Sequence, residues 1–174
     1  MNKVISIGNQ GFDKIRENDY FYVDKTGFIK EWWESGDDVT LITRPRRFGK
    51  TLNMDMLKCF FSNQYTGRAD LFEGLSIWKE EKYRELQGQY PVIFVSFADV
   101  KERDYESAVR KIKHILVDLY LQYEFLKKNF SESEQMRYRQ ISYNMDNVAA
   151  QDALKSLAAL LSSYYEKKAI ILLD

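Results

Sequence analysis

Apolar residues along the chain fall into two patterns, short continuous runs and helically spaced stripes. The continuous runs predict strands at DYFYVDKT (19–26), VTLIT (39–43), PVIFVSF (91–97) and AIILLD (169–174). Apolar spacing of three and four residues predicts helices over residues 10–18, 26–35, 50–62, 104–128 and 148–166. Residues 63–90 read as a mixed region with glycine turns, and the polar residues 131–143 read as helical or irregular.

The order of these elements predicts an α/β fold. Strands that are apolar on both faces and separated by helices favour a mainly parallel sheet covered on both sides, which makes three layers. Ligands of such sheets bind beyond the carboxyl ends of the strands, often at helix N-termini. Two segments of this sequence place polar residues there.

The first segment is RPRRFGKT (44–51), which lies between a predicted strand and a predicted helix. It ends in Gly49-Lys50-Thr51, as does the phosphate-binding pattern G-x-x-x-x-G-K-[ST], although Arg44 replaces the first glycine. A glycine lets the backbone approach a phosphate, a lysine reaches the β- and γ-phosphates, and a threonine hydroxyl ligates Mg²⁺. The alternative is that a common tripeptide merely starts a helix.

The second segment is AIILLD, an apolar strand that ends in Asp174. An acid at this place is typical of the carboxylate associated with Mg²⁺ in phosphate-loop NTPases. Taken alone, the segment is better explained as an ordinary buried strand followed by an Asp that starts a turn. Together with the loop at 44–51 it favours a nucleotide site.

The amino-acid composition argues against several classes of functional site. The 174 residues carry 26 Lys+Arg and 26 Asp+Glu, so the formal net charge is zero, and this balance argues against wholesale coating of nucleic acid. One His and one Cys cannot form a Cys/His zinc site, and nothing local supports a triad built on His114. A single Cys, no signal-peptide pattern and no long apolar run favour the cytoplasm and no membrane partner.

Four segments resemble the bacterial AAA-ATPase-like family: FYVDKTGFI, TRPRRFGKTL, PVIFVSFADVK and AIILLD. Members of that family commonly carry a PD-(D/E)XK-type nuclease domain at the C-terminus. The resemblance runs from about Phe12 to Asp174, and it implies an additional-strand P-loop NTPase core that uses ATP and Mg²⁺. In this family arginine stands at the position of the first glycine, as Arg44 does here.

We therefore predict a nucleotide site in the loop and the first turn of the helix. The predicted nucleotide-binding residues are Arg46, Arg47, Phe48, Gly49, Lys50, Thr51 and Leu52, and the predicted Mg²⁺ ligands are Thr51 and, through a water, Asp174. Arg46 and Arg47 have alternative roles, as contacts to an acidic partner or DNA or as salt bridges that fix the loop. For Phe48 the alternative is an anchor of the loop.

The resemblance also predicts how the chain is organised. We expect the N-terminal part of a longer protein, with a lead-in over residues 1–38 and the P-loop domain from residue 39 to the Walker B strand at 174. Such a part would bind ATP but hydrolyse it poorly or not at all, since the water attack on the γ-phosphate needs groups of the intact chain. We also expect an open sheet edge that favours self-association. The alternative functions are a non-hydrolysing regulatory module and a nucleic-acid-binding accessory domain that works through RPRR.

Overall fold

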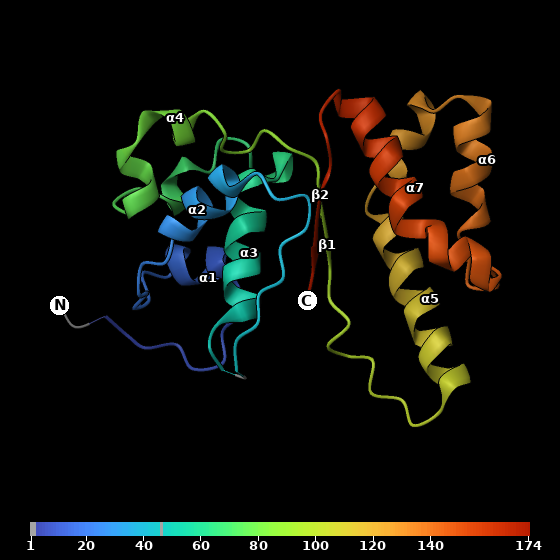
Figure 1. Cartoon of the computed structure of the whole chain (residues 1–174), viewed down its shortest axis with the longest axis horizontal. Coiled ribbons are helices and arrows are strands. Elements are labelled where there is room, and N and C mark those ends of the chain that lie inside the picture. Colours follow the sequence, from blue (N-terminus) through green and yellow to red (C-terminus); the bar gives the residue numbers. More distant parts are fainter. Residues whose placement is uncertain (1–2, 46) are drawn as a thin grey trace. The chain divides into compact units, whose positions relative to one another are not determined.

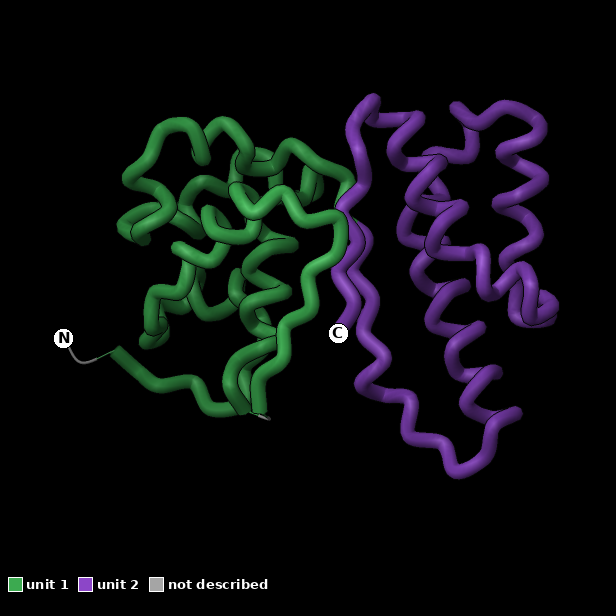
Figure 2. The backbone as a smooth tube through the Cα atoms, in the orientation of Figure 1, with its two compact units in different colours: residues 1–92 green, residues 93–174 purple. Residues whose placement is uncertain are grey.

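The computed structural model describes residues 3–45 and 47–174, which form two compact units, residues 1–92 and 93–174 (Figure 2). Each unit is described by itself. The first holds α1 (Phe12–Glu17), α2 (Gly27–Ser35), α3 (Lys50–Phe61), α4 (Glu81–Arg84) and the 3-10 turns η1 (Asn63–Tyr65), η2 (Ala69–Leu71) and η3 (Ser76–Lys79). The predicted helices at 10–18, 26–35 and 50–62 are confirmed. The predicted boundary after residue 38 stays a prediction.

The first unit packs around α3 (Figure 1). Met56, Phe60 and Phe61 on this helix are completely buried, as the helical spacing of apolar residues predicts. From α2, the Trp33 ring stacks on Phe61 with the ring centroids 5.3 Å apart. Gly36 ends α2 in the left-handed conformation, with φ 67°, which is the expected C-terminal signal.

A buried carboxylate joins α1 to α3. Asp55 is 7% exposed, and its Oδ2 accepts a hydrogen bond of 2.7 Å from the backbone N–H of Phe12, the first residue of α1. Its Oδ1 pairs with the Lys58 ammonium, one turn further along α3. Burial of a carboxylate is costly unless hydrogen-bond donors surround it, and Phe12 N–H and the Lys58 ammonium are such donors here. The Asp55 carboxylate therefore holds the start of α1 against α3; this contact is called the α1–α3 joint below.

The second unit holds α5 (Tyr105–Leu121), η4 (Glu124–Asn129), α6 (Glu132–Gln140), α7 (Asn147–Tyr165), β2 (Ile170–Leu173) and all but the first residue of β1 (Val92–Val95). Helices α5 and α7 lie side by side and bury Leu116, Tyr120, Leu157 and Leu161 between them and their neighbours (Figure 1). Asp104 and Asp146 cap the two helices. Within the described ranges no helix is long and apolar enough to cross a membrane.

Strands β1 and β2 form a parallel pair and confirm two of the predicted strands. The backbone N–H of Asp174 donates to Val95 O and that of Phe97 donates to Asp174 O, both at 2.9 Å. This alternation of one residue between two residues of its neighbour is the parallel ladder. Coverage is only partial, because Leu172 is buried while Ile171 and Leu173 are 41% and 53% exposed.

The predicted strand at 39–43 is wrong for this structure. The segment forms no ladder with any described residue, and Val39 and Leu41 are 88% and 83% exposed. Among the described residues none pairs its backbone with this segment. A β-strand is stable only when its backbone is hydrogen-bonded to a neighbouring strand, so high β-propensity alone does not produce a strand here.

The predicted strand at 19–26 is also wrong. The segment DYFYVDKT forms no ladder: the Tyr22 ring meets the Phe12 ring edge-on at 5.3 Å, whereas Phe21 is 53% exposed. Thr26 is completely buried at the start of α2. A run of aromatic and β-branched residues therefore does not by itself specify a strand. In this segment Tyr22 packs against α1, and no described residue forms a ladder with it.

Replacement of Asp55 tests the joint between α1 and α3. Asp55→Ala leaves the buried Phe12 N–H without its acceptor, so we expect a loss of about 2 kcal/mol in the free energy of unfolding. Urea unfolding followed by circular dichroism measures it. Asp37→Ala, an exposed carboxylate beyond α2, is the control and should change stability by less than about 0.5 kcal/mol. Equal urea midpoints for Asp55→Ala and Asp37→Ala would show that Asp55 does not stabilise the contact between α1 and α3.

Candidate functional site

The loop before α3 ends on a left-handed glycine. Gly49 has φ 74° and ψ 26° and is the N-cap of α3, and its carbonyl accepts the N–H of Asn53 at 2.9 Å. The first N–H groups of a helix have no intrahelical acceptor, and a glycine offers no side chain to cap them. The N-terminus of α3, half-buried at Lys50 and Thr51, therefore carries the partial positive charge that favours an anion.

The Lys50 side chain folds back over the loop. Its ammonium donates to the carbonyl oxygen of Arg44 at 2.8 Å and to that of Pro45 at 3.2 Å. These bonds span the loop from its first residues to the start of the helix. The Lys50 ammonium is therefore held across the loop, and its binding of a phosphate stays a prediction.

The other loop side chains that the structure describes before Gly49 are exposed. Arg44 and Arg47 form no ion pair with any described residue, so the structure gives the salt-bridge role of Arg47 no support. Arg46 lies outside the described residues. Phe48 is 59% exposed, so burial does not anchor the loop there. Arg47 adopts a left-handed backbone with φ 68°, which is costly for a residue with a Cβ atom.

A cation that the motif did not reveal adjoins this loop. A Cβ atom built on Gly49 would lie 3.7 Å from the Nζ of Lys25, a residue of the FYVDKT segment. The segment 26–48 separates the two residues along the chain, so no motif search reveals this proximity, which depends on the packing of the chain. The only signal in the sequence was that FYVDKT accompanies the loop in the resemblance.

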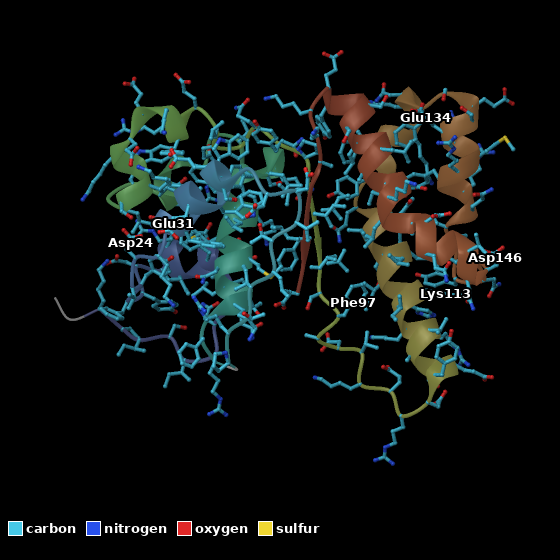
Figure 3. All side chains as sticks on the ribbon, viewed as in Figure 1. Asp24, Glu31, Phe97, Lys113, Glu134 and Asp146 are labelled. Carbon is cyan, nitrogen blue, oxygen red and sulfur yellow. The ribbon has the colours of Figure 1, made fainter. Side chains whose placement is uncertain are left out.

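The segment around Lys25 is fixed by Asp24. One carboxylate oxygen accepts from the N–H and the hydroxyl of Thr26, at 2.9 and 2.6 Å, and the other accepts from the N–H of Ser76 at 2.7 Å. Partial burial opposes ionisation of this carboxyl, but the bonds from Thr26 and Ser76 outweigh it and hold the pKa of Asp24 below its ordinary value. Figure 3 labels Asp24 beside the helices of the first unit.

Asp174 directly follows β2 in the second unit. Its backbone pairs with β1, and its carboxylate accepts from the Ser96 hydroxyl at 3.3 Å. The structure thus brings Gly49, Lys50 and Thr51 together in one turn. Asp174 and Thr51 belong to different units, so their joint binding of Mg²⁺ stays a prediction.

Comparison with known proteins gives one family. A family model described as "Predicted AAA-ATPase" matches residues 6–174. A protein of Azotobacter chroococcum mcd 1, described as "Uncharacterized protein in vnfD 5'region", is 40% identical over 115 residues, which are 66% of this chain and 21% of that protein. The chain thus spans about a fifth of the length of that relative. No solved structure gives a significant match.

Replacement of Asp24 tests how firmly the segment beside the loop is held. Asp24→Asn turns one acceptor oxygen into a donor that faces an N–H, so we expect a loss of about 1 kcal/mol at pH 7. Because the folded pKa lies below the ordinary value, the wild-type advantage is present above about pH 4 and disappears as the pH falls through the folded pKa. Thermal unfolding against pH measures both effects.

Glu31→Gln is the matched control for that substitution. It makes the same change of carboxylate to amide at an exposed position of α2, which Figure 3 also labels. We expect its stability to follow that of the wild type at every pH. An Asp24→Asn variant that is as stable as Glu31→Gln at pH 7 would show that the hydrogen bonds of Asp24 do not hold the segment.

Proposed function

Because the chain belongs to the AAA-ATPase-like family of predicted AAA-ATPases, we propose that it binds the triphosphate of ATP at the loop 44–51 and the first turn of α3. The observation that carries the proposal is the turn made by Gly49, Lys50 and Thr51. It joins a helix N-terminus, a cation held across the loop and a hydroxyl in the family's phosphate motif.

The residues present fit a polyphosphate. Backbone N–H groups at the start of α3 donate to phosphate oxygens, and the Lys50 ammonium leaves the carbonyls of Arg44 and Pro45 to bind the β- and γ-phosphates. Gly49 has no Cβ, so a phosphate reaches the backbone there. Arg47 and Arg46 add positive charge at the mouth of the loop, and the exposed Phe48 and the half-buried Leu52 border the nucleotide.

The oxygen donors also fit Mg²⁺, a hard cation that binds few protein ligands and keeps several waters. In the proposed complex the Thr51 hydroxyl binds the metal directly, and Asp174 binds it through a water. Bound Mg²⁺ neutralises the charge of the β- and γ-phosphates. The bond from Ser96 orients the Asp174 carboxylate at the end of β2.

The fold proposed for the family extends the parallel pair β1–β2 to a three-layer, additional-strand P-loop sheet. Residues 39–43 would become the strand before the loop once another strand pairs with them. Their exposed Val39 and Leu41 support this, since a buried sheet would cover such side chains. The chain matches only about a fifth of the length of its relative, and this supports a longer protein. Water attack on the γ-phosphate and a nuclease domain are proposals for that longer protein. Self-association through an open sheet edge is a proposal for this chain itself.

Substitution of Lys50 tests ATP binding. Lys50→Ala removes the charge-assisted bonds to phosphate, so we expect ATP affinity to fall about 10- to 100-fold in calorimetric titration with Mg²⁺ present. The thermal midpoint should change little, because the side chain bonds only to exposed loop carbonyls. Lys30→Ala is the control, since that ammonium pairs with Glu80 at 2.8 Å.

Two outcomes would contradict the proposal. The first is a wild-type chain that binds no ATP at millimolar concentration. The second is salt-dependent DNA binding that survives Lys50→Ala and is lost when Arg46 and Arg47 are both replaced, which would instead favour a nucleic-acid-binding module.

A further inference from the structure

The ammonium of Lys25 lies at the phosphate loop although the residue is outside the motif. A Cβ at Gly49 would be 3.7 Å from its Nζ, which is van der Waals distance. The side chain is exposed, and it forms no hydrogen bond or ion pair with any other residue that the structure describes. It contrasts with Lys30 and Lys82 in the same unit, whose ammonium groups pair with Glu80 and Glu34.

The backbone on both sides of Lys25 is fixed. Asp24 is bonded to Thr26 and Ser76, and Thr26 is completely buried, with its hydroxyl 3.0 Å from that of Ser76 and accepting from the N–H of Ile77 at 3.2 Å. The Lys25 side chain therefore starts from a held position between two anchors. A ligand group presented in this way loses less conformational freedom on binding than one on a mobile loop.

Two lysines of the first unit thus belong to this loop region: the Lys50 ammonium is held on the carbonyls of Arg44 and Pro45, and the Lys25 ammonium lies near Gly49. Lys50 follows Gly49 directly, and Lys25 reaches the same glycine from the segment before α2. An anion bound between two ammonium groups offsets their mutual repulsion, and Gly49 presents no Cβ atom to such an anion. A triphosphate carries more negative charge than one lysine neutralises, so a second ammonium is chemically suited to it.

We propose that Lys25 is a second phosphate-binding lysine, which contacts the same polyphosphate as Lys50 from outside the P-loop motif. This inference rests on the proposed function, because it assumes that the loop 44–51 binds a nucleotide. It assigns a role to the FYVDKT segment: Asp24 and Thr26 hold the backbone, and Lys25 points its charge to the phosphate.

The test compares Lys25→Gln with Lys30→Gln in the full 174-residue chain. A fluorescent ATP analogue bound with Mg²⁺ is displaced by ATP and, separately, by inorganic tripolyphosphate. We expect Lys25→Gln to weaken both competitors about tenfold and by the same factor, because the lost contact is to phosphate. Lys30→Gln loses the same charge at a position turned to Glu80 and should match the wild type. Lys25→Arg keeps the charge and should stay within about threefold of the wild type.

Each other result overturns the inference. Wild-type affinity in Lys25→Gln would remove Lys25 from the site while leaving ATP binding intact. If Lys25→Gln weakens the binding of ATP but not of tripolyphosphate, Lys25 contacts the nucleoside and not the phosphates. If Lys30→Gln loses as much affinity as Lys25→Gln, the loss comes from the net charge of the chain and not from a contact of Lys25. If the wild-type chain binds neither the analogue nor ATP, the proposed function itself fails. Unchanged thermal midpoints show that all variants are folded.

Discussion

The burial of one face of α3 is the constraint on which the first unit depends. Met56, Phe60 and Phe61 must leave water together, and α1, α2 and the turns after α3 supply the cover. Asp55 adds a polar joint on the same helix. Once the C-terminal part of α3 is fixed in this way, its N-terminus emerges with Gly49 and Lys50 at the surface. The stable core and the proposed binding turn are thus two ends of one helix.

The second constraint is the hydrogen bonding of Asp24. Its carboxylate ties the start of α2 to the start of η3, and this holds Lys25 beside the loop. Residues far apart in the sequence therefore meet through a single acceptor with two oxygens. The same geometry explains why DYFYVDKT is not a strand: Asp24 and Thr26 are hydrogen-bonded within a turn, and the Tyr22 ring packs against Phe12.

The sequence alone was sufficient to predict the elements that the local pattern of residues determines. Apolar spacing predicts α2, α3 and α7 within about two residues, and the turn at Gly49 follows from the motif. It was insufficient for elements that form only when another part of the chain pairs or packs with them. Residues 39–43 have every local property of a strand but no neighbour among the described residues, and the helix predicted over 104–128 ends at Leu121 and continues as a 3-10 turn. Lys25 was missed for the same reason, since its proximity to Gly49 is tertiary.

The central claim is that the turn of Gly49, Lys50 and Thr51 holds the phosphates of ATP. Amide hydrogen exchange of the intact chain, with and without Mg²⁺ and ATP, tests it most directly, because it reports which backbone N–H groups gain an acceptor. We expect exchange to slow at residues 47–52 and at the Lys25 segment, while α5 to α7 exchange as before. ATP binding that leaves residues 47–52 unprotected would contradict the claim.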